Sequence, residues 1–108
     1  MAHAFNNENF EKEVKQASKP VLVDFWAEWC GPCMKLAPTI DALSKERDDI
    51  IIGKVNIEEC PDLAAEYRVQ GIPFMAIFHE GKVVSTQVGL QPKANLEEWI
   101  EETVKKIK

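Results

Sequence analysis

Two cysteines separated by glycine and proline are the residues of this chain whose types and spacing best fit a chemical role. They form the segment Cys30-Gly31-Pro32-Cys33, which follows the apolar run 21–26 and precedes a helical pattern. The thiols are therefore expected where a strand ends and a helix begins. Unpaired backbone N–H groups and the positive dipole end of a helix stabilise a thiolate there, and two cysteines on one helical turn can close a disulfide. The pattern indicates thiol–disulfide exchange.

Other uses of a cysteine pair fit the sequence less well. A zinc ribbon needs a second ligand pair, and Cys60, His3 and His79 stand at no recognisable ligand spacing, so we expect no metal site. Covalent haem attachment needs a histidine after the second cysteine, where this sequence has Met34. Two inert core cysteines would leave the intervening Gly-Pro unexplained, because these residues fill a core poorly and shape turns well.

A carboxylate also stands in an unusual place. Asp24 interrupts the run 21–26, which otherwise suits a central strand with both faces covered. Burial without partners raises the pKa of a carboxyl group and lets it exchange protons near neutrality. The alternative is an aspartate at an exposed strand end, with Lys54 of the next strand on a solvated face.

The elements that must position these residues alternate between strand and helix. Apolar runs predict strands at 21–26, 50–57, 74–78 and 82–88. The short link Glu80-Gly81 predicts a tight antiparallel hairpin between the last two, so the sheet is expected to be mixed.

Apolar residues at helical spacing predict four helices. The first is capped by Asn6 or Asn7 and ends before Pro20, the second follows the cysteines and contains Pro38, and the third is opened by Pro61. The inward residues that define these helices and the terminal one are Phe10, Val14, Ala17, Leu36, Ile40, Leu43, Leu63, Ala64, Tyr67, Leu96, Trp99, Ile100, Thr103, Val104 and Ile107.

Composition bounds the size of the fold and the class of partner. A chain of 108 residues, 45% hydrophobic and 29% charged, fits a single domain spanning residues 1–108. A net charge of -5 disfavours nucleic acid and anionic membranes as partners, so we expect proteins. The N-terminal segment lacks the pattern of a signal peptide, and no apolar run reaches transmembrane length. The number of cysteines is three, so in a secreted protein held together by disulfides one thiol would have no partner. We therefore expect a cytoplasmic location.

The segment Trp26-Ala27-Glu28-Trp29-Cys30-Gly31-Pro32-Cys33 resembles the active-site segment of the thioredoxin family. Further matches occur in thioredoxin order over nearly the whole chain, at Asp24, Pro38, Lys54, Gly71-Ile72-Pro73, Gly81 and Gly89. The resemblance implies an α/β thioredoxin fold, with a mixed sheet of four or five strands flanked by helices on both faces. It also implies a cis peptide before Pro73, whereas the sequence alone would fit an ordinary trans proline opening an edge strand.

The catalytic roles follow from helix position and from the resemblance. Cys30 is expected to be the nucleophile, because it is nearer the exposed N–H groups and should have the lower pKa. Cys33, one turn deeper, would resolve the mixed disulfide. By resemblance, Asp24 accepts the proton of Cys33 and Lys54 modulates the charge of Asp24.

A weakly polar surface around Cys30 is expected to dock extended segments of target proteins. Trp29, Gly31 and Pro32 form the active-site turn. Phe74 stands where thioredoxins commonly have threonine, so it either makes the groove more apolar or points inward to pack against a helix. The residues expected to bind substrate are Trp29, Gly71, Ile72, Pro73, Phe74 and Gly89.

Two further residues have open interpretations. Trp26 fits equally a core aromatic beneath the site and a residue that supports catalysis. Cys60 is expected to be an inert packing residue, because Glu58, Glu59 and Asp62 disfavour a thiolate. The alternative is a regulatory role for Cys60, through a disulfide or glutathionylation.

The function implied is that of a monomeric protein disulfide reductase, an electron carrier that holds no cofactor and works with a thioredoxin reductase and oxidised target proteins. Gly31 and Pro32 carry no charge to stabilise the thiolate, which favours reduction over disulfide formation or isomerisation. The alternative is a binding module that uses the fold as a subunit or folding helper without redox chemistry.

Overall fold

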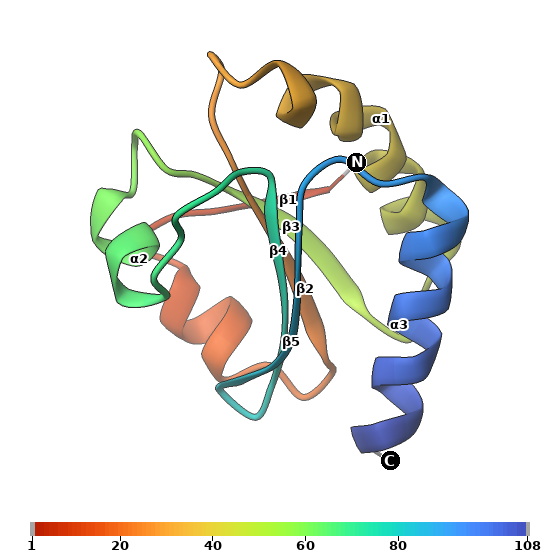
Figure 1. Cartoon of the computed structure of the whole chain (residues 1–108). Helices are drawn as coiled ribbons and strands as arrows, with labels where there is room; N and C mark the ends of the chain where they lie inside the picture. The colour runs from red at the N-terminus through yellow and green to blue at the C-terminus, as the bar shows by residue number, and fades with distance from the viewer. Residues whose placement is uncertain (1, 108) are drawn as a thin grey trace.

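A five-stranded mixed sheet with the strand order β1-β3-β2-β4-β5 forms the centre of the molecule (Figure 1). The structure is a computed structural model that describes residues 2–107. Strands β1 and β2 run parallel to β3, whereas β4 runs antiparallel to β2 and to β5. The expected mixed sheet is confirmed. The strands are β1 (His3–Phe5), β2 (Val21–Trp26), β3 (Ile51–Asn56), β4 (Phe74–His79) and β5 (Lys82–Val88).

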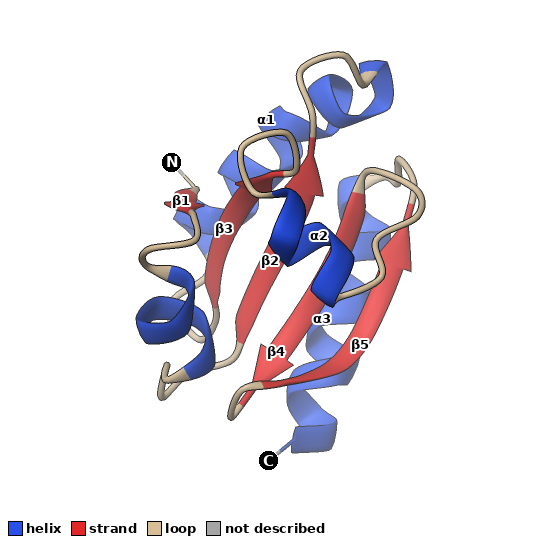
Figure 2. Ribbon diagram, turned by 90° about the vertical axis from the view of Figure 1, so that its left-hand side faces the viewer, coloured by secondary structure: helices blue, strands red, loops and turns tan. Residues whose placement is uncertain are grey.

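Helices cover both faces of this sheet, as expected (Figure 2). Helices α1 (Gly31–Glu46) and α3 (Lys93–Ile107) pack on one face. The short helix α2 (Pro61–Glu66) and the π-helical turn η1 (Glu11–Lys15) lie on the other. Within residues 2–107, no helix has the length and apolar character needed to cross a bilayer.

The central strand β2 is buried on both faces because its side chains alternate between two apolar clusters. Leu22 packs in the cluster that contains residues of α1 and α3. Val21, Val23 and Phe25 pack in the opposite cluster with residues of η1 and α2. Asp24 lies two residues after Leu22 on the same strand, so its side chain points to the same face of the sheet, which is covered by α1 and α3.

The N-terminal segment differs from the sequence-based expectation. The first helix is a single π-helical turn, and its N-cap residue is Phe10, which makes no side-chain cap hydrogen bond, so the predicted cap is wrong for this helix. Asn6 instead stabilises the preceding turn, where its Oδ1 accepts a hydrogen bond from the N–H of Asn9 at 3.0 Å. Strand β1 was not predicted at all. It has three residues, of which only Phe5 is buried, so it carries too little alternation to be recognised.

The hairpin between β4 and β5 forms at the predicted link. Glu80 and Gly81 have φ angles of 54° and 82°, the pair of left-handed conformations that a two-residue hairpin turn requires. Glycine adopts this conformation without steric cost. The turn pairs His79 with Lys82, and an irregularity between Ile77 and Phe78 then shifts the register by one residue. This shift brings Val88 opposite Phe74, at the end of the sheet nearest the cysteines.

Candidate redox site

The two cysteines lie at the start of α1 and are joined in a disulfide. Their Cα atoms are 5.2 Å apart, a separation that a disulfide can span. Cys30 is the N-cap residue of α1, and its Sγ accepts a hydrogen bond from the backbone N–H of Cys33 at 3.1 Å. Such a donor stabilises negative charge on the sulfur of Cys30 once the disulfide is reduced. The geometry supports Cys30 as the attacking thiolate.

The disulfide is nearly enclosed, with an exposed aromatic ring next to it. Cys30 is 5% exposed and Cys33 is 2% exposed. Both pack with Ala27, Trp26, Ile57 and Ile72 in a small apolar cluster. Trp29, one residue before Cys30, is 67% exposed, and Gly31 and Pro32 are exposed as well. A target disulfide would therefore approach over the turn formed by these three residues.

The loop between α2 and β4 faces the disulfide. The peptide between Ile72 and Pro73 is cis, as the resemblance implied, and the carbonyl oxygen of Ile72 lies 3.8 Å from Sγ of Cys30. The N–H of Gly89 donates a hydrogen bond to the carbonyl oxygen of Pro73 at 2.8 Å. Gly89 has a φ of 95°, a conformation that favours glycine. Gly71 is exposed beside this pair of segments.

Phe74 is half-buried and packs inward. Its ring lies 5.8 Å from the ring of Phe25 in an edge-to-face arrangement, against the cluster shared with η1 and α2. This contact favours the inward-packing interpretation over a role in the groove.

Replacing Phe74 with Thr is expected to lower stability by about 1–3 kcal/mol, because it removes a partly buried aromatic side chain. Insulin reduction at a temperature where both proteins are folded is expected to stay within about twofold of wild type, since the ring does not face the substrate. The measurement is the rate on insulin and on a second, unrelated protein disulfide. Rates that change differently on the two substrates would establish a groove role instead.

Asp24 is fully buried beneath α1, so the interpretation of an exposed strand end is wrong. Neither carboxylate oxygen has a hydrogen-bond partner among the described residues. Burial raises the pKa of Asp24 to about 7, and the positive charge of Lys54 opposes part of that rise. The carboxylate can therefore accept and release a proton near neutral pH.

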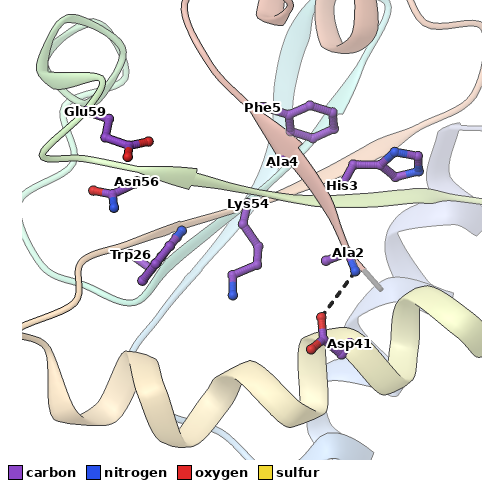
Figure 3. A pocket seen from close by; sticks show the side chains of 9 residues that line it. All are labelled: Ala2, His3, Ala4, Phe5, Trp26, Asp41, Lys54, Asn56 and Glu59. Atoms are coloured by element: carbon purple, nitrogen blue, oxygen red, sulfur yellow. Dashed lines mark hydrogen bonds between the residues drawn. The ribbon is translucent and has the colours of Figure 1, made fainter.

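Lys54 and Trp26 lie beside Asp24. Lys54 is the register partner of Asp24 on β3, and its Nζ lies 4.6 Å from the centroid of the Trp26 ring. Both side chains are half-buried and line a cavity of about 230 Å³, shown in Figure 3. Trp26 thus packs against the cysteines and also holds the lysine, so its two interpretations both find support in its contacts.

Some surface residues near the site were missed by the sequence analysis. Met34, Val88 and Leu90 are large apolar side chains that are 49%, 56% and 48% exposed. Their positions in the sequence could have indicated that they lie near the site, because Met34 follows Cys33 directly and Val88 and Leu90 flank Gly89. They add apolar surface next to residues already assigned to the groove.

The remaining candidates lie away from this chemistry. Cys60 is a free, buried cysteine at the start of α2, in agreement with the packing role expected for it. Trp99 is a core residue whose indole N–H donates to the hydroxyl of Ser85 at 2.7 Å. Across residues 2–107, no group of three or more potential ligand side chains gathers at a metal-binding geometry.

Comparison with known proteins gives a consistent result. A family model described as thioredoxin matches residues 1–102. A thioredoxin of Rickettsia felis is 44% identical over 105 residues, which cover 96% of this chain and 100% of that protein. Thioredoxins of Rhodospirillum rubrum and Streptomyces clavuligerus are 44% and 48% identical, over 89% and 83% of this chain and 93% and 84% of theirs.

Proposed function

Because this chain belongs to the thioredoxin family, we propose that it is a reductant of protein disulfides in which Cys30 attacks, Cys33 resolves and Asp24 moves the proton. Family membership makes the chain a disulfide oxidoreductase that works by dithiol/disulfide exchange. The observation that carries the assignment of roles is the pair of cysteines at the start of α1, with a backbone N–H directed at the sulfur of Cys30.

The proposed cycle begins with the reduced protein. The thiolate of Cys30 attacks one sulfur of a target disulfide, forming a mixed disulfide and releasing the first target thiolate, which takes a proton from solvent. Cys33 gives its proton to Asp24 and attacks Sγ of Cys30. The new bond is the Cys30–Cys33 disulfide, and the second target thiolate leaves and is protonated. The target gains the two electrons that the cysteines lose.

Substrate binding is proposed for the exposed turn and the loops that face it. The proposed groove consists of Trp29, Gly71, Ile72, Pro73 and Gly89. Ile72 supports it, because this residue packs with Cys30 and its carbonyl oxygen lies 3.8 Å from Sγ of Cys30. An extended target segment can pair with the backbone of the loop at Ile72. Lys54 is proposed to modulate the charge of Asp24, since the two residues are register partners. The half-buried contact of Phe74 with Phe25 argues against a direct role in this groove.

The wider setting belongs to the proposal as well. The family implies a thioredoxin reductase and protein disulfides as partners. We expect residues 1–108 to act as a single, monomeric domain in the cytoplasm without a cofactor of its own. The acidic net charge of -5 supports protein partners over nucleic acid.

The reduction potential of the Cys30–Cys33 pair tests the direction of the reaction. We expect a value below about −200 mV, because uncharged Gly31 and Pro32 do little to stabilise the reduced form, whereas disulfide-forming relatives lie near −120 mV. Equilibration in defined dithiol buffers, followed by tryptophan fluorescence, gives the value. The matched variant Pro32→His should shift it upward by tens of millivolts, since each 30 mV is about 1.4 kcal/mol.

A potential near the oxidising end would reverse the proposed direction. The absence of a reversible transition would instead support a binding module that needs no redox chemistry. The double variant Cys30→Ser with Cys33→Ser would then keep its biological activity.

A further inference from the structure

We propose that the cavity between β1, β3 and α1 is the route by which protons leave and reach Asp24, with Lys54 as its gate. The cavity is lined by Lys54 and Trp26 from the sheet, Asp41 from α1 and the β1 segment that contains Ala2 and Ala4. The inference rests on the proposed role of Asp24 as proton acceptor for Cys33. It adds a function to a surface on the β1–β3 side of the central strand, whereas the proposed groove lies on the β4–β5 side.

Most of the surroundings of Asp24 are closed to proton transfer. Its register partner on β4 is Met75, which is fully buried. Leu22, Leu36 and Ile40 belong to the apolar cluster on the same face of the sheet. Apolar packing of this kind offers no hydrogen-bonding groups along which a proton could move.

Among the described residues, several polar groups lie around a cavity on the β3 side of Asp24. Lys54 comes from β3, Asp41 from α1 and Glu59 from the segment after β3, and all three line the cavity. The neighbouring residue from β4 is Met75, which carries no charge. Among the described residues, the side of Asp24 that faces Lys54 therefore has both the charges and the open space that proton transfer needs.

The cavity is large enough to carry water. Its volume of about 230 Å³ would hold several water molecules at roughly 30 Å³ each. Figure 3 shows the Lys54 side chain pointing into the space between β3 and α1, with Trp26 and Asp41 to either side. Asp24 itself does not line the cavity, whereas its register partner Lys54 does, so Lys54 connects the position of the carboxylate with this space.

Lys54 is held in a way that allows it to move. Its ammonium lies over the ring of Trp26, at 4.6 Å, and within residues 2–107 it forms no ion pair with a carboxylate. A cation–π contact of this kind is worth about 0.5–1 kcal/mol, so thermal rotation of the side chain can break it. The edge of the cavity formed by Ala2 and Asp41 is held by a hydrogen bond, which the N–H of Ala2 donates to Oδ1 of Asp41 at 3.2 Å.

The position of the cavity makes such a route useful. The proposed groove lies beside β4 and β5, whereas the cavity lies beside β1 and β3, on the other side of the central strand. A target bound through a mixed disulfide would cover Cys30 and leave the cavity open. The proton that Asp24 takes from Cys33 can then pass to water or a buffer base in the cavity, which leaves Asp24 ionised for the next cycle.

Filling the cavity tests the route directly. Ala4 is exposed on β1, is the register partner of Lys54 and lines the cavity, so Ala4→Phe places a ring over its opening. The readout is the infrared band of the protonated Asp24 carboxyl after a rapid pH jump across pH 7, in the oxidised full-length protein. The band is assigned by its loss in Asp24→Asn.

We expect Ala4→Phe to slow the change of this band by about tenfold and Ala4→Leu to slow it less. The control is Ala94→Phe, which adds the same ring to an exposed position of α3 and should leave the rate unchanged. A rate in both Ala4 variants equal to that of wild type would overturn the route.

A separate readout distinguishes failure of the route from failure of the proposed function. In a single-turnover reduction of insulin, Asp24→Asn should be slower than wild type. If Asp24→Asn is slow while filling the cavity changes no proton-exchange rate, the acceptor role stands and the route is wrong. If Asp24→Asn reduces insulin as fast as wild type above and below neutral pH, both the acceptor role and the route are wrong.

Discussion

Cys33→Ser is expected to convert the protein from a catalyst into a trap for its targets. Cys30 can still attack a disulfide, but no thiol one helical turn away remains to attack the mixed disulfide. Insulin reduction under multiple turnover should fall by about a thousandfold or more, because the two cysteines act as a unit. A covalent adduct between Cys30 and the target should accumulate, and non-reducing electrophoresis with mass spectrometry measures it.

The matched control is Cys30→Ser, which should lose activity to the same extent and form no adduct. Cys33 lies within the first turn of α1, whereas Cys30 is its N-cap residue, and Cys33 is also the less exposed of the two, at 2% against 5%. We therefore expect Cys33 not to replace Cys30 in the attack on a target disulfide. Cys60→Ser should retain wild-type activity, since Cys60 is buried in a different cluster. An adduct formed by Cys30→Ser through Cys33 would show that the assignment of the two roles is reversed.

The central elements could be predicted because their residues have one dominant environment. The run 21–26 is apolar on both faces, and β2 is indeed covered on both. The inward stripe of the terminal helix matches the buried residues of α3, except that Ile107 at its end is half-buried. Long, strongly periodic patterns of this kind predict the same element whichever segments pack against it.

Strand β1 escaped prediction because its stability comes from a partner far away in sequence. It pairs with β3 over three residues, and Phe5 packs so closely on Gly53 that a Cβ there would overlap the ring. Gly53, within the strand predicted at 50–57, could have indicated this contact, because a glycine in a strand often marks a place where another segment approaches closely. A glycine alone does not indicate which segment of the chain approaches it.

The site could be predicted in its chemistry and only partly in its arrangement. The cysteine motif and the buried carboxylate follow from residue types at fixed spacing along one chain segment. The contact of Lys54 with Trp26, the inward packing of Phe74 and the cavity beside β1 depend on the register of neighbouring strands. The register between strands that are far apart in sequence, such as β1 with β3 and β2 with β3, is not set by a hairpin turn, so the pattern within one strand does not specify which residues meet.

The buried carboxylate of Asp24 makes stability depend on pH in a direction that can be stated. In the unfolded chain its pKa is the ordinary value of 3.8, and in the folded protein it is about 7. Between these values the folded protein binds more protons than the unfolded chain, so stability falls as pH rises and the loss is complete above pH 7. The difference corresponds to roughly 4 kcal/mol, at about 1.4 kcal/mol for each pKa unit.

Asp24→Asn should therefore stabilise the oxidised protein by roughly 2–4 kcal/mol above pH 8, because it removes a buried charge and keeps the size of the side chain. The gain should shrink as the pH falls and be small at pH 4, where the carboxyl is neutral in the folded protein and only about half ionised in the unfolded chain. Urea unfolding of both proteins from pH 4 to pH 9 measures the difference, and Asp48→Asn, at an exposed carboxylate, is the control that should change stability by less than about 0.5 kcal/mol. A gain that is the same at every pH would show that Asp24 keeps its ordinary pKa when buried, and a carboxyl of that kind could not take the proton of Cys33 at neutral pH.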